Sequence, residues 1–583
     1  MPEIPPLTPL PLDLLLRRIA VEWETRRRIF DLPSARIWRR PDDVDLSIDF
    51  LGRRAASPVG PAAGPHTQMA QNIVLAWLGG ARLFELKTVQ VLDELEIARP
   101  CIDMETVGYN IEWSQELRVA ESLEEYVKAW MILEILRRWE PLGELLGPDP
   151  GPHVFDLSVG YDLAGISGEK VAGFIESMRD ATAEIDRLRP LVAGPFAAFA
   201  DLDFPSRIAD TVTLSTFHGC PPDEIDAITR HLMDRHGLDV VVKLNPTLLG
   251  YEQVDAILHD VLGYDEIRLS REAFDADLQM DRAVELIGDL RDHARRTGRR
   301  FGIKLTNTLV VENHKGFLPD DPMYLSGPPL HVISSTLLDA LVRRLPGVLR
   351  LPGQDGDVQV SFSAGVTKEN LADTLAMGVA PATMSTDLLK PGGYGRLKPM
   401  LGALEKELRA AGVADLEAWR RLRLEAARSG GHRDPVDAHV QAMLHGDERA
   451  RYAKDGLKPP RRVDHALAMW GCVACNLCVT VCPNDAVLKV PTPDDADVEG
   501  RWQYLVFAEL CNECGNCMVF CPEDGDPAQV KPRLFFDPDR FAAADGQRFL
   551  VRREPLRFVA APGWEGDAAT LAAVASGPDG LPV

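Results

Sequence analysis

The sequence predicts an α/β protein in which a TIM (β/α)8 barrel is followed by a small cysteine-rich domain. Short apolar runs alternate with amphipathic helical stretches through the middle of the chain, and eight of the ten cysteines fall near its end. A length of 583 residues also exceeds one ordinary domain. We expect an N-terminal helical arm at 1–50, the barrel at 51–430, a linker at 431–462, the cysteine-rich domain at 463–540 and a tail at 541–583.

The barrel strands are predicted from short apolar runs bounded by turn residues. Amphipathic helices such as 222–235 and 278–296 lie between most of these runs, which is the pattern of βα units. Repeated βα units over this length favour a closed barrel over an open sheet. One run more than a barrel needs is present, and we expect 266–270 to lie outside the barrel as an insertion. The nine runs are 57–63, 83–88, 154–160, 211–215, 240–244, 266–270, 302–306, 358–363 and 382–386.

Composition and charge exclude some classes of partner. Hydrophobic residues make up 45% and charged residues 26%, so an ordinary core can form. The net charge of −24, from 64 Lys+Arg against 88 Asp+Glu, disfavours nucleic acid and anionic membrane as partners. No apolar run reaches the length of about 18 residues that indicates a membrane span, and the N-terminus lacks the basic region of a secretory signal. Because the cysteines follow a metal pattern rather than a disulfide framework, we expect a cytoplasmic protein.

The two cysteine motifs carry the most specific chemical signal. Residues 472–483 and 511–522 both read C-x2-C-x2-C-x3-C-P, the spacing with which bacterial ferredoxins bind [4Fe–4S] clusters. The first three cysteines of each motif bind one cluster, and the fourth binds the other. A pair of four-cysteine zinc sites is the alternative, but two complete ferredoxin motifs favour iron and sulfide. The expected ligand sets are Cys472, Cys475, Cys478 and Cys521 for one cluster, and Cys511, Cys514, Cys517 and Cys482 for the other.

Chemistry in a TIM barrel takes place at the carboxyl ends of the strands. The first strand ends in small residues, which let a flat cofactor lie on the backbone. Later strands end in lysines, and since a buried lysine without an anionic partner is costly, these indicate a negative ligand or an electron-rich ring such as reduced flavin. A single one of them is more often a solvated rim charge. The last two units place small and hydroxyl residues before helix starts, where such barrels bind phosphate. The candidate cofactor residues are Ala62, Ala63, Gly64, Lys87, Thr88, Lys243, Lys304, Gly365, Ser385 and Thr386.

The chain resembles the FMN barrel of dihydroorotate dehydrogenases and dihydropyrimidine dehydrogenase through the ordered segments SPVGPAAGP, FELKT, NIEWS, TLSTFHG, KLNP, TNT, SAG and MST. The second of these enzymes also has [4Fe–4S] clusters in a C-terminal ferredoxin-like domain. From about residue 10 to 550, the chain is similar to the selenate reductase iron–sulfur subunit family, through PVGPAAGPHTQMAQNIV, LSTFHGCPPDEI, STDLLKPGGYGR and CNECGNC. The resemblance implies an FMN-binding barrel and a ferredoxin-like domain with two [4Fe–4S] clusters.

The resemblance also implies which residues handle a proton. In those relatives the flavin exchanges hydride on one face of the substrate while a loop cysteine or serine handles the proton. The matching position here is Thr216, preceded by Ser215. A threonine hydroxyl is a poor acid or base without a partner, and we expect His218 to polarise it, with Cys220 as the alternative. A structural role is an equally good interpretation of His218 and Cys220.

Substrate contacts are implied in the same way. Asn110, Thr213, Asn307 and Thr308 match positions that contact a planar ring in the pyrimidine enzymes, and Glu112 adds an acceptor for a ring N–H. Asparagine both donates and accepts, which suits the alternating C=O and N–H edge of a pyrimidine or oxopurine. The relatives have asparagine where Thr213 stands, so the ring or its orientation differs. The structural alternative is that the amides cap loops.

Together these features predict an oxidoreductase that exchanges hydride between FMN and a planar cyclic amide, with two clusters relaying single electrons. Long members of the resembling family carry an FAD and NAD(P)H module between barrel and ferredoxin domain. Here only a linker occupies that place, and no G-x-G-x-x-G follows a strand. We therefore expect an oligomer with a separate FAD-containing reductase subunit, or a ferredoxin, as partner. Two alternatives stay open: an electron-transfer subunit without substrate chemistry, and a glutamate synthase-like amino-acid oxidoreductase.

Overall fold

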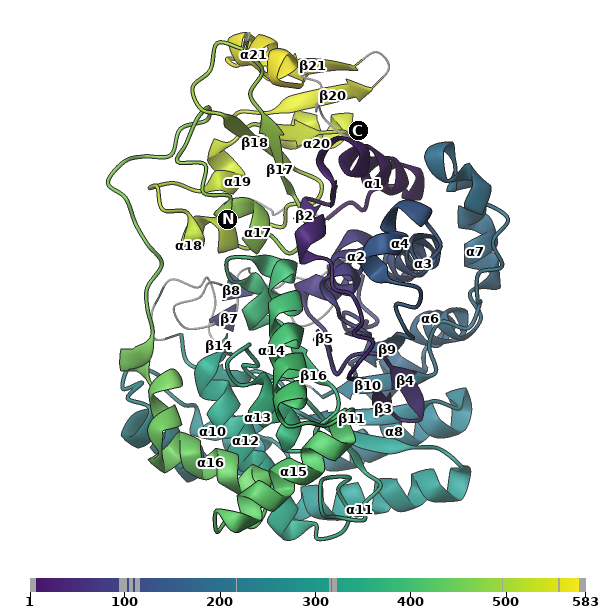
Figure 1. Cartoon of the computed structure of the whole chain (residues 1–583), viewed down its shortest axis with the longest axis vertical. Helices are drawn as coiled ribbons and strands as arrows, with labels where there is room; N and C mark the ends of the chain where they lie inside the picture. Colours follow the sequence, from purple (N-terminus) through teal and green to yellow (C-terminus); the bar gives the residue numbers. More distant parts are fainter. Residues whose placement is uncertain are drawn as a thin grey trace.

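The computed structural model describes residues 7–93, 102–103, 109–110, 116–216, 218–313, 316, 322–494, 496–553 and 556–575. Figure 1 shows the barrel in the lower part of the molecule and the C-terminal part, which holds the two cysteine motifs, above it. Helix α1 (Leu12–Arg26) lies beside the C-terminal part and also packs on the outside of the barrel. The first and last segments of the chain therefore meet at one end of the molecule.

Eight parallel strands form the barrel, and they follow one another around it in sequence order. The sheet closes where the backbone N–H of Arg82 donates to the carbonyl of Val59 at 3.2 Å. Gly60 lies at this seam, because a Cβ there would stand 1.7 Å from the carbonyl oxygen of Leu83. The strands are β5 (Val59–Pro61), β6 (Leu83–Glu85), β9 (Val154–Val159), β10 (Thr211–Ser215), β11 (Asp239–Leu244), β12 (Phe301–Leu305), β15 (Gln359–Phe362) and β16 (Ala382–Met384).

The predicted barrel is confirmed, and the structure shows which of the nine runs lies outside it. Eight of the nine apolar runs contain the barrel strands, whereas 266–270 forms no strand and lies between α9 (Tyr251–Ala256) and α10 (Arg271–Ala276). Apolar residues in that run are used to pack a loop, since Ile267 and Leu269 are buried. A short apolar run is ambiguous for this reason.

Helices cover the outside of the barrel. The helices predicted at 222–235 and 278–296 are α8 and α11, with bounds that differ from the expectation by at most two residues. In the described part of the chain, no helix is both long and apolar enough to cross a membrane. The main helices are α2 (Ala70–Gly79), α3 (Val119–Leu136), α6 (Glu169–Arg179), α8 (Pro222–His236), α11 (Met280–Thr297), α12 (Pro328–Arg344), α13 (Leu371–Ala376), α14 (Leu397–Ala410), α15 (Leu416–Ser429) and α16 (Pro435–His445).

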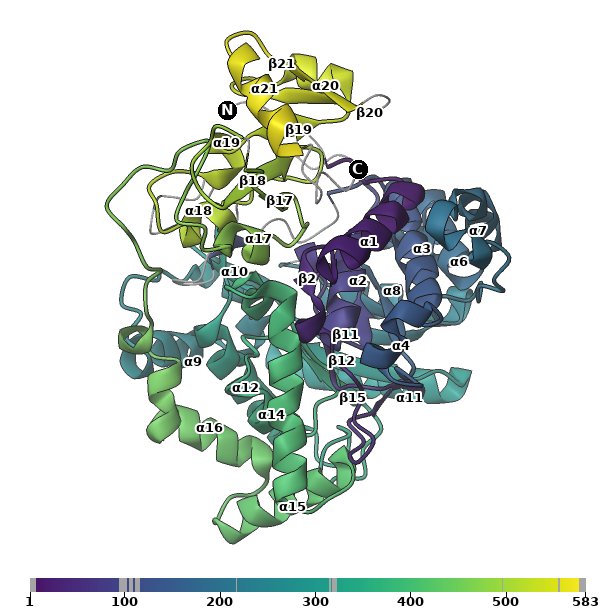
Figure 2. The same ribbon diagram turned by 45° about the horizontal axis from the view of Figure 1, so that its top comes forward.

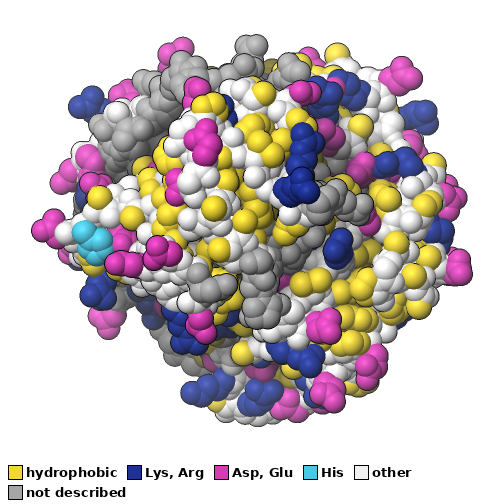
Figure 3. Space-filling model, turned by 90° about the horizontal axis from the view of Figure 1, so that it is seen from above, with side chains coloured by type: hydrophobic (Ala, Val, Ile, Leu, Met, Phe, Trp, Pro, Cys, Tyr) yellow, Lys and Arg dark blue, Asp and Glu magenta, His cyan; other side chains and the backbone are white. Residues whose placement is uncertain are grey.

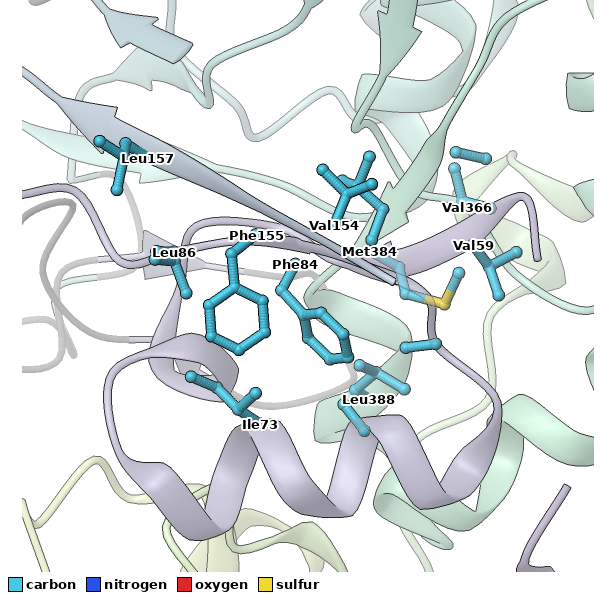
Figure 4. Packing of buried hydrophobic residues seen from close by; sticks show 14 of the residues in the cluster. Val59, Ile73, Phe84, Leu86, Val154, Phe155, Leu157, Val366, Met384 and Leu388 are labelled. Atoms are coloured by element: carbon cyan, nitrogen blue, oxygen red, sulfur yellow. The ribbon is translucent and has the colours of Figure 1, made fainter. Parts of the chain in front are cut away.

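Successive residues of the barrel strands point alternately outward and inward, as the pleat of a strand requires. Figure 4 shows Phe84 and Phe155 directed outward toward α2, where they meet Ile73. Their ring centroids lie 5.3 Å apart in an edge-to-face arrangement. The next residue of each strand, Glu85 and Asp156, is buried on the opposite face, inside the barrel. The outer face thus packs helices, while the interior carries charge.

A smaller four-stranded sheet stands between the barrel and the C-terminal part. It is built from the loops that follow β6 and β12. Its strands are β7 (Ile102–Asp103), β8 (Tyr109–Asn110), β13 (Leu309–Val311) and β14 (Met323–Leu325). Because these loops leave the carboxyl ends of barrel strands, the sheet lies at the end of the barrel where chemistry is expected.

The C-terminal part contains a five-stranded sheet and short helices. Each cysteine motif folds into a loop followed by one of these helices, α17 (Leu477–Val481) or α18 (Asn516–Phe520). The strands are β17 (Val487–Pro491), β18 (Trp502–Phe507), β19 (Arg533–Phe535), β20 (Phe549–Arg553) and β21 (Leu556–Ala560), and α21 (Glu565–Ala575) packs on them.

The stretch that follows α17 docks the C-terminal part on the barrel. Asn484 receives a hydrogen bond on its carbonyl from Gln71 Nε2 at 3.1 Å, and one on its Oδ1 from Asn72 Nδ2 at 3.1 Å. The phenol of Tyr394 donates to the carbonyl of Pro483 at 2.9 Å. All of these donors lie on α2 or on the loop after β16, so the barrel presents a preformed docking face.

The N-terminal helix adds an ion pair to this docking. Figure 2 shows α1 lying against both the C-terminal part and the helices of the barrel. Arg18 Nη2 lies 2.8 Å from the Asp485 carboxylate and its Nε lies 2.6 Å from Glu22, with all three side chains buried. Burial alone would lower the pKa of Arg18, but the surrounding carboxylates raise it above its ordinary value. A permanently charged arginine therefore holds the arm to the C-terminal part.

Candidate functional site

A pocket opens at the carboxyl ends of the barrel strands. Its walls come from the ends of β5, β10, β11, β12, β15 and β16, which is where a TIM barrel binds its ligands. Of the residues singled out in the sequence, those that line it are Ala62, Ala63, Gly64, Thr88, Ser215, Lys243, Asn307, Thr308, Gly365, Ser385 and Thr386. The chain thus brings residues more than 300 positions apart into one site.

Glycines bring backbone close to backbone in this pocket. A Cβ on Gly64 would stand 3.1 Å from the hydroxyl of Ser385. Gly365 has a φ of +53°, and a Cβ there would stand 2.4 Å from the carbonyl of Gly327, so no larger residue fits. Thr386 begins a 3-10 turn at Thr386–Leu389, as expected. The expectation was wrong for Gly365, because the following helix, α13, begins only at Leu371.

The lysines have an anionic partner that the sequence analysis missed. Glu85, at the end of β6 and fully buried, lies with its Oε1 3.8 Å from Lys243 Nζ and with its Oε2 bonded to Lys304 Nζ. Lys304 also donates to the hydroxyl of Thr383 at 2.9 Å. Since β6 and β12 are not neighbours in the sheet, these contacts cross the barrel interior. The inference that buried lysines require a negative ligand is therefore wrong for Lys304, which does not line the pocket.

Electrostatics differ along this charged layer. Burial would raise the pKa of Glu85, but Lys304 and Lys243 outweigh burial and hold it below its ordinary value. Burial lowers the pKa of Lys243, and the attraction of Glu85 offsets this only in part because Lys304 and Lys87 repel the charge. Lys243 is the one lysine of the three whose side chain reaches the pocket wall. Its pKa is thus below the ordinary value of a lysine, because burial and the neighbouring lysines disfavour its charge.

Two other expected residues lie away from the pocket. Lys87 is buried, and its carbonyl accepts a hydrogen bond from Tyr126 at 2.9 Å. Thr213 is in the middle of β10, where its hydroxyl donates to Asp156 at 2.6 Å, and Thr211 does the same to the other carboxylate oxygen. Burial raises the pKa of Asp156 to about 7, and the two hydroxyls counteract it. Thr213 thus belongs to the barrel interior rather than to the substrate face.

The expected pair of Thr216 and His218 does not form. The Thr216 hydroxyl donates to the carbonyl of Lys243 at 2.7 Å. His218 instead lies with its Nδ1 2.8 Å from Asp277 and its Nε2 3.3 Å from the carbonyl of Thr308. Both partners are acceptors, so a doubly protonated ring donates to both and a neutral ring to one. His218 is therefore a partner of Asp277 and lies next to Thr308, which lines the pocket.

Asp277 is a second functional candidate that the sequence analysis missed. Besides His218, its carboxylate accepts from the hydroxyl of Thr247 at 2.6 Å, from Asn245 Nδ2 at 3.2 Å and from the backbone N–H of Gly219. These donors and His218 outweigh the effect of burial and lower its pKa, so it is an anion. No local motif marks Asp277, because its partners are spread over the chain.

Cys220 is buried beside this network and is not among the residues that line the pocket. Burial, together with the nearby carboxylates of Glu224 and Asp277, raises the pKa of its thiol to about 12. A thiol with so high a pKa is a poor nucleophile and a poor acid at neutral pH. The structure thus favours the structural interpretation of Cys220.

The side-chain amide of Asn307 connects the loops around the pocket through hydrogen bonds. Asn307 Nδ2 donates to the carbonyl of Thr216 at 2.9 Å and to Asn245 Oδ1 at 2.7 Å, and the Ser215 hydroxyl lies 3.4 Å from Asn307 Oδ1. The Asn307 amide N–H₂ is thus engaged by the protein itself. Asn110 lies in β8, and its side chain, like Glu112, lies outside the described residues.

The two cysteine loops have the same backbone conformation. Ala474 and Glu513, the second residues after the first cysteine of each motif, both have positive φ, at 51° and 54°. Asn476 and Gly515, two residues further on, also share it, at 64° and 77°. L-residues other than glycine rarely adopt this region, so the repetition reflects a common requirement on both loops.

The cysteines gather into the two sets expected from the spacing. Cys472, Cys475, Cys478 and Cys521 line one small cavity within the C-terminal part. In the other set, burial raises the pKa of Cys482 to about 11, and burial together with the nearby Cys482 raises the pKa of Cys511 to about 12. Cys514 and Cys517 are close enough to Cys482 and Cys511 to be raised by them as well. Each fourth cysteine thus crosses to the other loop.

The comparison with protein families agrees with the barrel. The family described as oxidoreductase YgfK, N-terminal TIM-barrel domain, matches residues 30–433, more than half of the chain. The chain belongs to the YgfK oxidoreductase family. Its family is thus one of oxidoreductases with a TIM barrel. The sequence motifs led us to expect a selenate reductase subunit, and the comparisons do not confirm that name.

Two curated members of the YgfK family show how far the likeness extends. The chain is 38% identical over 528 residues to the oxidoreductase YgfK of Escherichia coli strain K12, and the same values hold for that of Escherichia coli O157:H7. These matches cover 86% of this chain and 47% of each relative. The chain spans about half the length of the curated relatives it matches.

Among solved structures, the ligand-free DHODH from Eimeria tenella matches with a TM-score of 0.40 and 16% identity, covering 69% of this chain and 96% of that one. The same enzyme in complex with ferulenol matches with a TM-score of 0.39 and 15% identity, covering 71% and 96%.

Proposed function

We propose that this member of the YgfK family is an iron–sulfur flavoprotein, with FMN in the barrel mouth and two [4Fe–4S] clusters on the cysteine loops. Hydride would pass between FMN and a planar cyclic amide, such as a pyrimidine or oxopurine, and electrons would pass through the clusters to or from a partner. The observation that best supports this proposal is the docking of residues 480–485 on the barrel, which holds the pocket and the two cysteine sets in a fixed arrangement. A cofactor pair separated by a flexible link would not need that docking.

The pocket residues fit a flavin mononucleotide. Ala62, Ala63 and Gly64 leave the backbone bare on one wall, where a flat ring lies against the chain. Lys243 offers a cation to the electron-rich edge of the ring. On the adjoining ends of β15 and β16, Gly365 and Ser385 with Thr386 offer backbone and hydroxyl donors for a phosphate. FMN, when bound, supplies the ability to take up single electrons and to transfer two as hydride.

The cysteine sets fit two cubane clusters. Each set has three cysteines from one loop and one from the other, which is the ligand pattern of two-cluster ferredoxins. Burial raises the pKa of the thiols, so binding of iron must displace their protons, as it does in thiolate metal sites generally. Zinc remains the chemical alternative, and the crossed sets argue against it because structural zinc sites use paired cysteines.

The position of the two sets relative to the barrel supports an order of the cofactors along the path of electron transfer. Cys482 is followed directly by Pro483 and Asn484, whose carbonyls accept bonds from the barrel. The cavity of the other set is lined entirely by residues of the C-terminal part. The set that contains Cys482 is thus the one next to the flavin site, and the set that contains Cys475 faces outward. Cys475 is exposed.

The hydrogen bonds beside the pocket support proton handling by His218. The Asp277 carboxylate holds the ring through Nδ1, and the carbonyl of Thr308 orients Nε2. A substrate that displaces the weak 3.3 Å contact to Thr308 would receive the Nε2 proton. The hydroxyls of Thr216 and Ser215 hold the loop that precedes His218 in place. This pair favours a barrel with its own substrate chemistry over an electron-transfer subunit without any.

A partner would dock on the C-terminal part, within 463–540. Two large apolar side chains are unusually exposed there, Val473 at 45% on the outward cysteine loop and Met518 at 43% on α18. Figure 3 views the molecule from this end, where hydrophobic side chains lie among scattered acidic and basic ones. A separate FAD-containing reductase subunit or a ferredoxin matches a surface of this kind, because apolar residues exposed beside a redox centre bring the two centres close.

Anaerobic purification followed by cofactor analysis tests the proposal. We expect about eight iron and eight acid-labile sulfides per chain, and FMN as the released flavin. Cys514→Ser should lose about half of the iron and keep the flavin, because its cluster lies outside the barrel. Zinc without labile sulfide, or FAD instead of FMN, would contradict the cofactor assignment.

Anaerobic reduction tests the partner. Dithionite should bleach the flavin, whereas NADH and NADPH without a second protein should leave it oxidised. Rapid bleaching by either nucleotide alone would contradict the need for a separate reductase. Val473→Asp serves as a docking variant, since it should weaken reduction by the partner and leave reduction by dithionite unchanged.

A further inference from the structure

Three potential metal ligands meet behind the pocket, away from all of the residues assigned above. They are Asp373 on α13, His439 on α16 and Glu448 in the 3-10 turn Asp447–Arg451. One ligand atom from each lies within 4.8 Å of the other two. His439 is 5% exposed, and Asp373 and Glu448 close the cluster on the solvent side.

A chain of hydrogen bonds fixes which nitrogen of His439 carries its proton. His331, fully buried on α12, lies with its Nδ1 2.8 Å from the carbonyl of Ala364 and its Nε2 2.9 Å from Nε2 of His439. A carbonyl can only accept, so the proton of a neutral His331 is on Nδ1 and its Nε2 accepts. His439 must then donate from Nε2 and keep a lone pair on Nδ1.

That lone pair faces other acceptors. Nδ1 of His439 lies 3.6 Å from Oε2 of Glu448. This carboxylate oxygen is buried and has no hydrogen-bond partner among the described residues. Three acceptor groups therefore converge, and although arginines contact the outer carboxylate oxygens, the lone pair of Nδ1 and Oε2 of Glu448 face one another, an arrangement that a cation at the centre would stabilise.

The spacing and the ligand types indicate the kind of cation. Ligands in tetrahedral coordination about 2.1 Å from an ion are about 3.4 Å apart, close to the separation of Nδ1 and Oε2. An imidazole nitrogen disfavours Mg²⁺ and Ca²⁺, which take oxygen ligands, and two carboxylates with one imidazole suit Zn²⁺ or Mn²⁺. The absence of thiolate distinguishes this site from the cysteine loops.

The remaining carboxylate oxygens are held by arginines. Arg423 Nη2 lies 2.5 Å from Asp373 Oδ1, and Arg451 Nη1 lies 3.3 Å from Glu448 Oε1. These contacts orient the free oxygens toward His439, as outer residues do around metal ligands. Their charges also oppose a cation, which limits its affinity.

We propose that Asp373, His439 and Glu448 bind one divalent transition-metal ion, through Nδ1 of the imidazole and one oxygen of each carboxylate. The ion would join α13, α16 and the turn at Asp447–Arg451. Through His439 and His331 it would also fix the carbonyl of Ala364, which lines the barrel pocket. This site is independent of the flavin and iron–sulfur proposal, and either can fail without the other.

Mn²⁺ binding to the full chain tests the site. Free Mn²⁺ gives a six-line electron paramagnetic resonance signal that is lost on binding, and Mn²⁺ has little affinity for thiolates, so the cysteine loops do not interfere. After removal of metal with a chelator, the oxidised protein should bind one Mn²⁺ per chain. Zn²⁺ should displace it, following the Irving–Williams order, and Ca²⁺ at the same concentration should not.

Variants assign the binding to the three residues. His439→Ala and Glu448→Gln should each weaken binding at least tenfold, and Arg451→Met should strengthen it by removing an opposing charge. His445→Ala, an exposed histidine at the end of the same helix, is the matched control and should bind as the wild type does. If His439→Ala misfolds by circular dichroism, Glu448→Gln alone decides, since Glu448 is partly exposed. An unchanged Mn²⁺ signal with the wild type, or equal binding by a correctly folded ligand variant, would overturn the proposal.

Discussion

Replacing Glu85 by glutamine should destabilise the barrel strongly although the two side chains have nearly the same shape. Glu85 is fully buried between Lys304 and Lys243, and glutamine would leave both ammonium groups without their counter-charge. The size of the loss follows from the geometry. At an effective dielectric of about 20, opposite charges about 4 Å apart attract by about 4 kcal/mol.

The full electrostatic sum is not lost, because a buried lysine without a partner can release its proton. Burial already lowers the pKa of Lys243, so this lysine is the first to become neutral in the variant. Removing one member of a buried ion pair costs about 3–5 kcal/mol in other proteins, and we expect a loss of unfolding free energy in that range.

The double variant Glu85→Gln/Lys304→Met separates this loss from mere disturbance of the interior. Because it removes the charge together with its partner, it should be more stable than Glu85→Gln alone, with a coupling energy of several kcal/mol. Pulse proteolysis in urea measures the unfolded population of the wild type, of the single variants Glu85→Gln and Lys304→Met, and of the double variant in parallel. If Glu85→Gln lies within about 1 kcal/mol of the wild type, or the single effects simply add, the ionic layer does not stabilise the barrel.

Three further variants test the site and the docking. Cys220→Ser should keep turnover of a dihydropyrimidine with an artificial electron acceptor, since burial raises the pKa of this thiol to about 12, and a tenfold loss would restore Cys220 as an acid. Asp277→Asn should lower the same turnover by about 100-fold with iron and flavin retained, because His218 loses the carboxylate that holds its Nδ1; wild-type turnover would show that the pair takes no part in the reaction. Gly393→Ala should release residues 480–485 to hydrogen exchange, because its Cβ would stand 2.0 Å from the Thr480 carbonyl. Gly412→Ala, with positive φ but open space, is its control, and equal protection in both would contradict the docking contact.

The barrel and the cysteine sets could be predicted because their signals are local. A barrel strand can be predicted from five or six consecutive apolar residues. A cysteine motif determines the backbone conformation of its own loop, as the matching positive φ values at Asn476 and Gly515 illustrate. The crossed ligand sets follow from the same spacing. In these cases a short stretch of chain contains all the information that the structure uses.

The site chemistry could be predicted only in part because it depends on distant partners. Glu85 and Lys304 are 219 residues apart, and His218 and Asp277 are 59 apart. Proximity in sequence suggested that His218 would polarise Thr216, but the threonine hydroxyl bonds the carbonyl of Lys243 on the neighbouring strand. For Glu85 a signal was present, since in FELKT it lies two residues from Lys87 and thus on the same face of an extended strand. Asp277 carried none.

The docking of the C-terminal part has a consequence for chain connectivity. Arg18 comes from the start of the chain and Gln71 and Tyr394 from the barrel, so the contacts that seat residues 480–485 owe nothing to the stretch at 453–461 that joins the two parts. That stretch acts as a tether and not as a hinge. A break in it, or a whole folded module inserted there, leaves every one of these contacts available, so the distance between the pocket and the cysteine loops is set by surfaces and is independent of the length of the connecting chain.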